Sequence, residues 1–228
     1  ILQMKLKHIF LFKRLLYYLY GEKFYKRLSY DWSKFPSRIS IIQNIINRKK
    51  YKKYLEIGCD QDENFSQIKI NSKIGVDPKS GGTHRMTSDV FFENNNKSKF
   101  DIIFLDGLHT YEQTIKDIKN SIKVIEDDGI ILIHDCLPKK IWNQIVPRIY
   151  GHWNGDVWKA IVEARTYKNI DTSTCIADHG IGVIFKRRNK NLLKFEIKNF
   201  KNLKFSDYYY KHKEFMNPIS HEKLMELI

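Results

Sequence analysis

Four residues of this chain combine the side-chain types needed for proton transfer or metal binding. Asp106 follows one apolar run, with His109 three positions later, and His134 and Asp135 follow another apolar run. If the two runs are neighbouring parallel strands, all four side chains meet at the carboxyl edge of a sheet, where open α/β sheets bind ligands. We therefore expect His109, Asp106, His134 and Asp135 to form a catalytic group.

The chemistry of this group has three interpretations. In the first, Asp106 and Asp135 bind a hard divalent ion such as Mg²⁺, which relieves the repulsion between close carboxylates and lowers the pKa of a bound hydroxyl. In the second, no metal takes part and His109 is the general base, oriented by an aspartate. In the third, the roles are structural: a histidine satisfied by a backbone carbonyl, and an aspartate that caps a helix.

A second set of residues has the spacing of a nucleoside-binding unit. The run Tyr54-Leu55-Glu56-Ile57-Gly58-Cys59-Asp60 reads as a buried strand and a glycine turn, and a second strand ends at Asp77, 21 positions after Glu56. A glycine lets the backbone approach a ligand closely, which we expect of Gly58. A carboxylate at the end of the second strand is placed to accept ribose hydroxyls, which we expect of Asp77.

The loop after Gly58 discriminates between nucleoside cofactors. Asp60, Asp62 and Glu63 would repel a pyrophosphate, which disfavours NAD and ATP. S-adenosylmethionine has no phosphate and a positively charged sulfur, so the acidic loop favours it. Downstream, one interpretation brings Ser88 and Asp89 to the adenine base with Phe91 stacked nearby, and the other makes them a helix cap. The expected cofactor contacts are Glu56, Ile57, Gly58, Cys59, Asp60, Asp77, Pro78, Ser88, Asp89 and Asp106.

Apolar runs separated by helical patterns predict an α/β sheet. We expect a turn at residues 127–129 and an antiparallel hairpin from the last two strands, at residues 170–177 and 182–185. Ser37 to Arg48 is expected to be a helix with an isoleucine face. Other expected features are a short helical turn at residues 64–68, a capping box of Thr110 and Gln113, and a final helix capped by Ser220.

A tryptophan-rich stretch precedes the hairpin. Residues 151–159 hold two glycines and the tryptophans Trp153 and Trp158 beside charged side chains. One interpretation is a substrate wall or lid. The other is a capped helix that begins near Trp158 and places its tryptophans in the core.

The net charge of +14 is unevenly distributed over the 228 residues. Residues 1–53 carry +12 and residues 186–228 carry +6, whereas residues 54–185 carry −4. We expect a basic helical N-terminal extension (1–49), a catalytic domain (50–186) and a basic C-terminal extension (187–228). A mildly acidic centre disfavours a nucleic-acid groove, while the basic flanks are suited to anionic surfaces.

The apolar runs at residues 9–12 and 15–20 are interrupted by Lys13 and Arg14, and neither is long enough to span a bilayer. The N-terminal helix is open to three interpretations: packing on its own domain, self-association into a homo-oligomer, or peripheral contact with a membrane surface. No small-residue cleavage site follows it, and three cysteines form no disulfide framework. We expect a cytoplasmic protein, with any membrane contact at the inner face.

Several segments together resemble a known family. Tyr54–Gly58, Gly75-Val76-Asp77-Pro78, residues 104–111, His134-Asp135 and Gly155-Asp156-Val157-Trp158 look like the class I S-adenosylmethionine-dependent methyltransferases. More narrowly, they are similar to a small bacterial group often encoded with polysaccharide- and sugar-modifying enzymes. The resemblance covers about residues 50–186. One departure is that Asp60 and Asp62 stand where glycines are usual.

The resemblance implies a Rossmann-like, doubly wound sheet of seven strands with the last strand antiparallel. It implies that Glu56, Gly58 and Asp77 hold the cofactor. In some sugar and catechol O-methyltransferases, acids after the fourth and fifth strands bind a divalent metal, and Asp106 and Asp135 match those positions.

We therefore expect O-methylation of a small molecule, a sugar or sugar-derived metabolite. A rival is nucleic-acid methylation, but Asp106-Gly107-Leu108 lacks the two prolines usual after the fourth strand of base-modifying enzymes. Another rival is a non-catalytic binding module that keeps the fold, and the two aspartates of the glycine loop are its best support.

Overall fold

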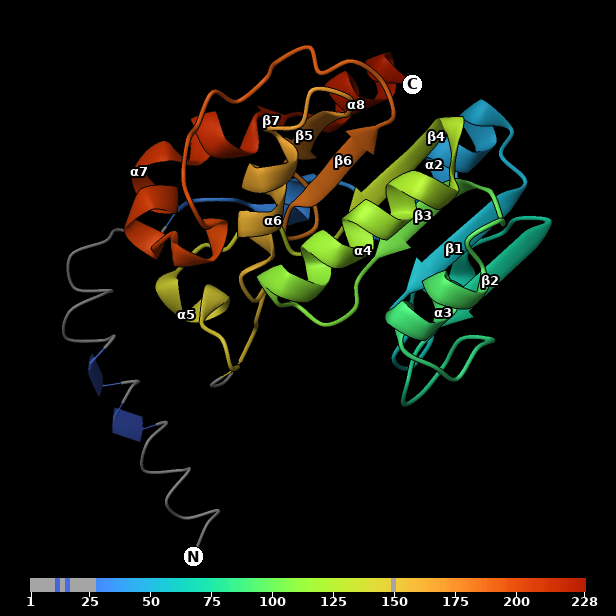
Figure 1. Ribbon diagram of the computed structural model, residues 1–228, viewed down its shortest axis with the longest axis horizontal. Coiled ribbons are helices and arrows are strands. Elements are labelled where there is room, and N and C mark those ends of the chain that lie inside the picture. The colour runs from blue at the N-terminus through green and yellow to red at the C-terminus, as the bar shows by residue number, and fades with distance from the viewer. Residues whose placement is uncertain (1–10, 13–14, 17–27, 149–150) are drawn as a thin grey trace, which may run out of the picture.

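A seven-stranded sheet with helices on both faces forms the centre of the molecule (Figure 1). The computed structural model describes residues 11–12, 15–16, 28–148 and 151–228, so most of the expected N-terminal helix lies outside the described residues. The strands are β1 (Lys53–Ile57), β2 (Ser72–Val76), β3 (Phe100–Leu105), β4 (Ile125–Ile133), β5 (Asp171–Cys175), β6 (Ile181–Phe185) and β7 (Pro218–Ile219). The helices are η2 (Trp32–Lys34), α2 (Arg38–Lys49), η3 (Phe65–Gln67), α3 (Ser88–Asn94), α4 (Tyr111–Val124), α5 (Ile141–Gln144), α6 (Val157–Ala164), η4 (Phe200–Asn202), α7 (Phe205–Met216) and α8 (His221–Leu227).

The strand order is β2-β1-β3-β4-β6-β5-β7. Strands β1 to β4 are parallel to one another, and β6 is antiparallel to both β4 and β5. The Rossmann-like sheet of seven strands and the antiparallel hairpin are therefore confirmed. The seventh strand, however, is β7, which comes from the C-terminal extension and runs parallel to β5.

The numbering of the strands differs from the expectation. Residues 77–99 contain α3 but no strand beyond the single bridge between Val76 and His84. Asp106 and Asp135 therefore follow the third and fourth strands along the chain, not the fourth and fifth. Their placement at neighbouring strand ends is unchanged, because β3 and β4 are paired in parallel from Ile102 to Leu105.

Side chains alternate between the two faces of the sheet, as the two-residue period of a strand requires. On β3, Ile103 and Leu105 pack against one core cluster, which includes α4, α6 and α7, while Ile102 and Phe104 pack against the other. The second cluster includes α2 and Leu224 of α8. The predicted isoleucine face of α2 is confirmed, with Ser37 as its N-cap: Ile41, Ile42, Ile45 and Ile46 are all buried.

Two local expectations were wrong, and in both a tertiary contact decided the structure. The Thr110 side chain makes no capping bond at the start of α4; instead, the Tyr111 amide donates to Asp156 Oδ1 at 2.6 Å. Residues 127–129 do not form a separate turn, because β4 extends through them. The pairing of β4 with β3 shifts between Ile125 and Ile130, so the intervening residues bulge out of the ladder.

The C-terminal extension packs into the same core as the sheet. Phe205, Tyr208, Phe215 and Met216 of α7 are buried in the cluster that covers β3 and β4. Ser220 caps α8 by accepting a hydrogen bond from the Lys223 amide, as predicted. Within the part of the chain that the structure describes, no helix has the length and hydropathy to cross a bilayer.

Candidate functional site

The turn after β1 brings the two predicted groups of residues together. Gly58 has φ +90°, and a Cβ built at this position would lie 2.3 Å from the carbonyl oxygen of Asp106. The close approach that needs glycine is therefore made by the Asp106-Gly107 backbone. Gly58 joins the end of β1, where a nucleoside is expected, to the end of β3, where the histidine–aspartate group begins.

Asp77 lies at the carboxyl end of β2, as predicted, and its carboxylate is held by backbone amides. Oδ1 accepts hydrogen bonds from Lys79 (2.7 Å) and Ser80 (3.0 Å), and Oδ2 accepts one from Asp60 (3.1 Å). Burial alone would raise the pKa of the Asp77 carboxyl, but these bonds outweigh it and the pKa is lowered. The group is ionised and fixed in position.

Two aspartates occupy left-handed backbone conformations in the loop after Gly58. Asp60 has φ 44° and Asp62 has φ 62°, so both adopt a conformation that favours glycine and that Asp tolerates better than most residues. Asp62 Oδ1 accepts the Gly82 amide at 2.6 Å. The Asp62 carboxylate thus fastens the 78–85 loop to the 58–62 loop.

Glu56 is buried inside the sheet, and its carboxylate is bonded within the protein. Tyr54 Oη donates to Glu56 Oε2 at 2.5 Å, and Asn64 Nδ2 donates to the same oxygen at 2.8 Å. Burial raises the pKa of Glu56 to about 7. Ile57 and Cys59 beside it are also buried. These buried side chains support the turn from within the core.

The remaining predicted cofactor residues are Pro78, next to Asp77, and Ser88 and Asp89 in α3. Pro78 is exposed, and Ser88 and Asp89 form the first turn of α3, whose N-cap is Thr87. Gln113 donates to Ser88 and Asp89, and Lys116 donates to Asp89 at 2.6 Å. Phe91 is fully buried in the core, so it is not placed to stack on an adenine base.

His109 lies between the two aspartates predicted to meet. Its Nε2 is 3.1 Å from Asp106 Oδ1, and its Nδ1 is 3.2 Å from Asp135 Oδ2. Burial lowers the pKa of His109, but the bond to Asp106 and the charge of Asp135 outweigh it and the pKa is raised. Trp153 covers the imidazole in a stacked arrangement, with ring centroids 5.4 Å apart. Of the two tryptophans, Trp153 is a wall of the site and Trp158 is a core residue.

His134 connects the same aspartates to the β5–β6 turn. Its Nδ1 is 3.1 Å from Asp106 Oδ1, and its Nε2 is 3.2 Å from Asp178 Oδ1. Burial would lower the pKa of His134, but Asp106 and Asp135 raise it well above its usual value. An imidazolium between carboxylates supplies the compensating positive charge, so the group is stable without a metal. The geometry also permits the metal interpretation, because ligand atoms of Asp106, His134 and Asp135 lie within 4.8 Å of one another.

A small hollow adjoins this histidine–aspartate group. Its cavity of about 10 Å³ has room for about one water molecule. The lining includes Asp106, His109 and His134 from the group, with Thr114 and Asp117 of α4 behind them. The four residues predicted to be catalytic are thus gathered at one place, next to space that a small polar group can enter.

Sequence reasoning missed the residues that surround Asp135 and His134 from distant loops. Asn154 donates to Asp135 Oδ1 at 2.7 Å, and the Arg38 amide donates to Asp178 Oδ2 at 2.6 Å. The rings of His152 and His179 stack with centroids 3.9 Å apart. Burial lowers the pKa of His179 to about 4. The segment Asp178-His179-Gly180 lies between the two strands of the predicted hairpin, and no local pattern marks its side chains as part of a site.

Comparison with known proteins finds one family model that matches part of the chain. Residues 46–136 match a family model described as a methyltransferase domain, a segment that runs from α2 through Asp135. No curated protein matches the chain significantly in sequence.

Solved structures share the fold at low identity. The SAH-bound methyltransferase PaMTH1 of Podospora anserina is 16% identical, with 68% of this chain and 81% of that chain covered and a TM-score of 0.51. A protein from Staphylococcus aureus assigned as a caffeoyl-CoA O-methyltransferase is 14% identical, with 76% and 91% covered and a TM-score of 0.50. A protein from Klebsiella pneumoniae assigned as an O-methyltransferase is 10% identical, with 68% and 84% covered and a TM-score of 0.52.

Proposed function

We propose that this protein is an S-adenosylmethionine-dependent methyltransferase that methylates a hydroxyl of a sugar or sugar-derived metabolite. The observation that carries the proposal is the meeting, across Gly58, of an ionised strand-terminal aspartate and a histidine–aspartate group. The match of residues 46–136 to a methyltransferase domain supports it, because that segment contains both halves.

The residues of the β1–β2 end fit this cofactor. The Asp77 carboxylate has about four lone-pair positions, and backbone amides occupy three of them. One position, on Oδ2, remains for a ribose hydroxyl while the 78–85 loop stays in place. The bound cofactor would supply an electrophilic methyl group on a positively charged sulfur, and the acidic residues Asp60, Asp62 and Glu63 are compatible with that charge.

The histidine–aspartate group supplies what a hydroxyl acceptor needs. A neutral alcohol is a poor nucleophile, so its proton must be removed as the oxygen attacks. To take this proton, His109 must turn one ring nitrogen from its carboxylate to the hydroxyl, while Asp106 or Asp135 holds the other nitrogen. A metal on Asp106 and Asp135 is the alternative means of acidifying the hydroxyl. An acceptor rich in hydroxyls, such as a sugar, suits a site lined by carboxylates and imidazoles.

Calorimetry with S-adenosylmethionine and S-adenosylhomocysteine tests the cofactor assignment. The wild-type protein should bind both, and Asp77→Asn should weaken binding by roughly 10- to 150-fold, the equivalent of about 1.5–3 kcal/mol for a hydrogen bond to a charged group. Asp127→Asn is the matched control, because its side chain is 95% exposed and remote from β2. Failure of the wild-type protein to bind would refute the proposal, and tighter binding of NAD would indicate another class.

A non-catalytic binding module is the second candidate. The bond from the Gly82 amide to Asp62 favours it, because it holds one loop over the other at the place where a cofactor is expected. Under this alternative the fold binds a sugar or another ligand without methyl transfer. Retained affinity for a sugar panel with no affinity for S-adenosylmethionine would support it.

A further inference from the structure

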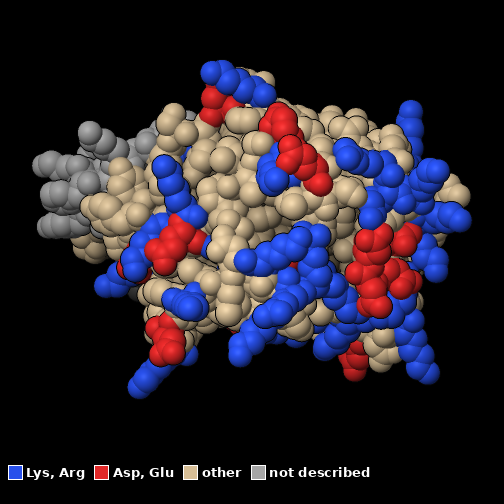
Figure 2. Space-filling view, turned by 90° about the horizontal axis from the view of Figure 1, so that it is seen from above, with Lys and Arg blue, Asp and Glu red and all other residues tan. Residues whose placement is uncertain are grey.

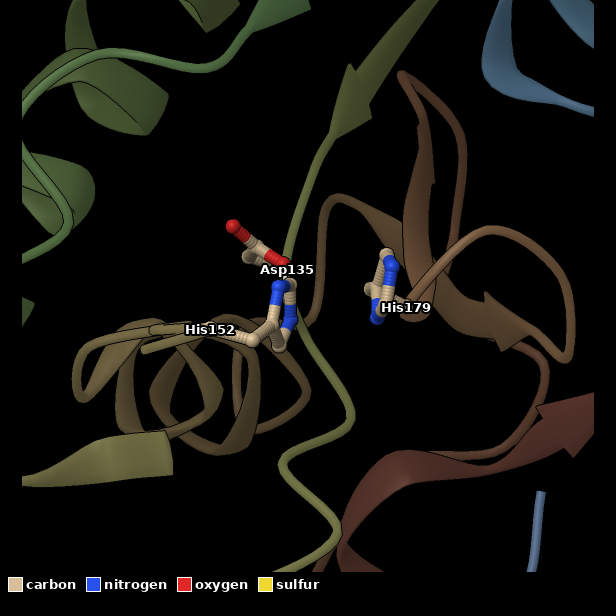
Figure 3. Close-up of side chains that lie close together, drawn as sticks. All are labelled: Asp135, His152 and His179. Carbon is tan, nitrogen blue, oxygen red and sulfur yellow. Dashed lines mark ion pairs between the residues drawn. The ribbon is translucent and has the colours of Figure 1, made fainter. Parts of the chain in front are cut away.

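Two histidines outside the predicted site, His152 and His179, bring metal-ligating atoms close to Asp135. Asp135 follows β4, His152 precedes α6, and His179 lies in the β5–β6 turn (Figure 3). One ligand atom from each of the three lies within 4.8 Å of the other two. The segments are far apart in sequence, so the fold itself creates this cluster.

The distance between His152 and Asp135 is closer to that between two ligands of one ion than to that of a hydrogen bond. His152 Nε2 and Asp135 Oδ1 are 3.7 Å apart, which is too long for a good hydrogen bond. Two tetrahedral ligands at 2.0–2.1 Å from one ion lie about 3.4 Å apart. Within the described part of the chain, neither imidazole ring makes a hydrogen bond, so both keep a nitrogen lone pair for a ligand.

Neighbouring groups hold the cluster in place. Asn154 Nδ2 donates to Asp135 Oδ1 at 2.7 Å and orients that oxygen. Asp178 fixes the turn that carries His179, because it accepts the Arg38 amide at 2.6 Å and contacts His134 at 3.2 Å. Metal ligands are commonly oriented by such outer contacts. His152 is 46% exposed, which gives an ion a route from solvent.

We propose that Asp135, His152 and His179 bind a divalent transition-metal ion such as Zn²⁺. Two imidazoles and one carboxylate are suited to Zn²⁺ and related ions, whereas Mg²⁺ prefers oxygen ligands. Three protein ligands leave a coordination position for water or a hydroxyl. This site differs from the one predicted on Asp106 and Asp135, since it uses the side of Asp135 that faces away from His109. Binding of the ion does not depend on the proposed function. A role for the ion in acidifying an acceptor hydroxyl would rest on the proposed function.

The test is metal binding by the full-length, tag-free protein after treatment with a chelator. Zn²⁺ is titrated by calorimetry, and Co²⁺ is titrated as a spectroscopic probe of nitrogen ligation. The wild-type protein should bind one equivalent of each, and a large excess of Mg²⁺ should not displace them. His152→Gln and His179→Asn should each weaken binding at least tenfold. Asparagine is chosen at position 179 because the backbone there has φ 63°.

His221→Gln is the matched control, because His221 lies at the start of α8, outside the cluster. Circular dichroism verifies that each variant is folded, and the exposed position of His152 makes at least that variant informative. No binding by the wild-type protein would overturn the proposal, and so would full affinity in both histidine variants. Loss of binding in Asp106→Asn, with His152→Gln and His179→Asn unaffected, would place the ion between Asp106, His134 and Asp135 instead. Each of these outcomes can be interpreted even if the protein does not bind S-adenosylmethionine, because metal binding is measured directly.

Discussion

His109 is the residue on which the choice between the two catalytic interpretations depends. It contacts both aspartates that were expected to bind a metal, so an imidazole occupies the position between them. A proton on this ring relieves the repulsion between the carboxylates as effectively as a cation would. A doubly protonated ring cannot act as a base, so His109 serves as the base only when it is neutral and one ring nitrogen turns from its carboxylate to the acceptor hydroxyl. Asp106 is then its orienting partner.

Methyl transfer with and without a chelator separates the two interpretations. With a panel of sugar acceptors, and release of the demethylated cofactor as the measurement, His109→Ala should reduce kcat by roughly 10²- to 10⁴-fold, the usual contribution of a general base. Activity should persist in the chelator. Loss of activity in the chelator, followed by recovery with Mg²⁺ or Mn²⁺, would instead support a metal on Asp106 and Asp135.

Glu56 gives the protein a predictable pH dependence of stability. Burial raises its pKa from 4.5 to about 7, so the folded state binds more protons than the unfolded chain between these values. The stabilising contribution of the protonated carboxyl is complete below pH 4.5 and is lost as the pH rises through 7. Glu56→Gln should therefore raise the free energy of unfolding at pH 8 by roughly 1–3 kcal/mol relative to wild type, and change it little at pH 4.5.

Urea unfolding at both pH values measures this effect. Glu226→Gln is the control, because Glu226 lies on the surface of α8 in an exposed pair with Lys223. Equal destabilisation of the Glu56 variant at both pH values would mean that its hydrogen bonds to Tyr54 and Asn64, rather than its charge, dominate.

At the scale of elements, the turn between β1 and η3 is the junction of the site. Gly58→Ala should cost about 3 kcal/mol or more of unfolding free energy, because the new Cβ meets the Asp106 backbone at 2.3 Å and φ is +90°. Gly151→Ala should cost only about 1–2 kcal/mol, since φ there is also positive but nothing lies within 4 Å of the Cβ. The two costs are measured by urea unfolding. Similar values would show that backbone strain alone, without the contact to Asp106, accounts for the cost of replacing Gly58.

The strands and their terminal acids could be predicted from sequence because the signal is local. An apolar run that ends in Asp77, Asp106 or Asp135 already indicates both the strand and the edge where its acid lies. The partners of those acids could not be predicted, because His152, Asn154 and Asp178 reach the site through loops placed by tertiary packing. The same reason explains the error at Thr110: the first turn of α4 is held by a bond from the Tyr111 amide to Asp156, 45 residues away, and the Thr110 side chain makes no capping bond.

At the scale of the whole molecule, one face carries positive charge that is spread out rather than gathered in a groove. Figure 2 shows lysine and arginine side chains distributed across one face, with groups of acidic side chains between them. Salt bridges such as Lys49–Asp128 and Lys186–Asp127 pair some of the basic side chains with acidic ones. On that face, the pattern agrees with the expectation of a small-molecule substrate rather than a nucleic acid.

The basic N-terminal segment remains the strongest candidate for contact with another surface. Residues 1–53 carry 14 basic and 2 acidic side chains. Among the described residues of this segment, Leu11, Phe12 and Leu15 are each more than half exposed. A basic segment with exposed apolar side chains is suited to an anionic membrane surface or to a second copy of the chain.

Deleting residues 1–20 should therefore change the oligomer size or abolish association with anionic liposomes, while leaving S-adenosylmethionine affinity unchanged, since Asp77 and the strand ends lie far along the chain. Native mass spectrometry and liposome flotation at low and high salt measure the two properties, and binding to headgroups should weaken with salt because the attraction is electrostatic.

A variant with Lys5, Lys7, Lys13 and Arg14 changed to Gln separates charge from apolar contact: it should lose liposome binding but keep self-association. If the truncated protein is folded, with the same mass and the same behaviour toward liposomes as the full chain, both the membrane and the self-association interpretations are wrong and the segment packs on its own domain.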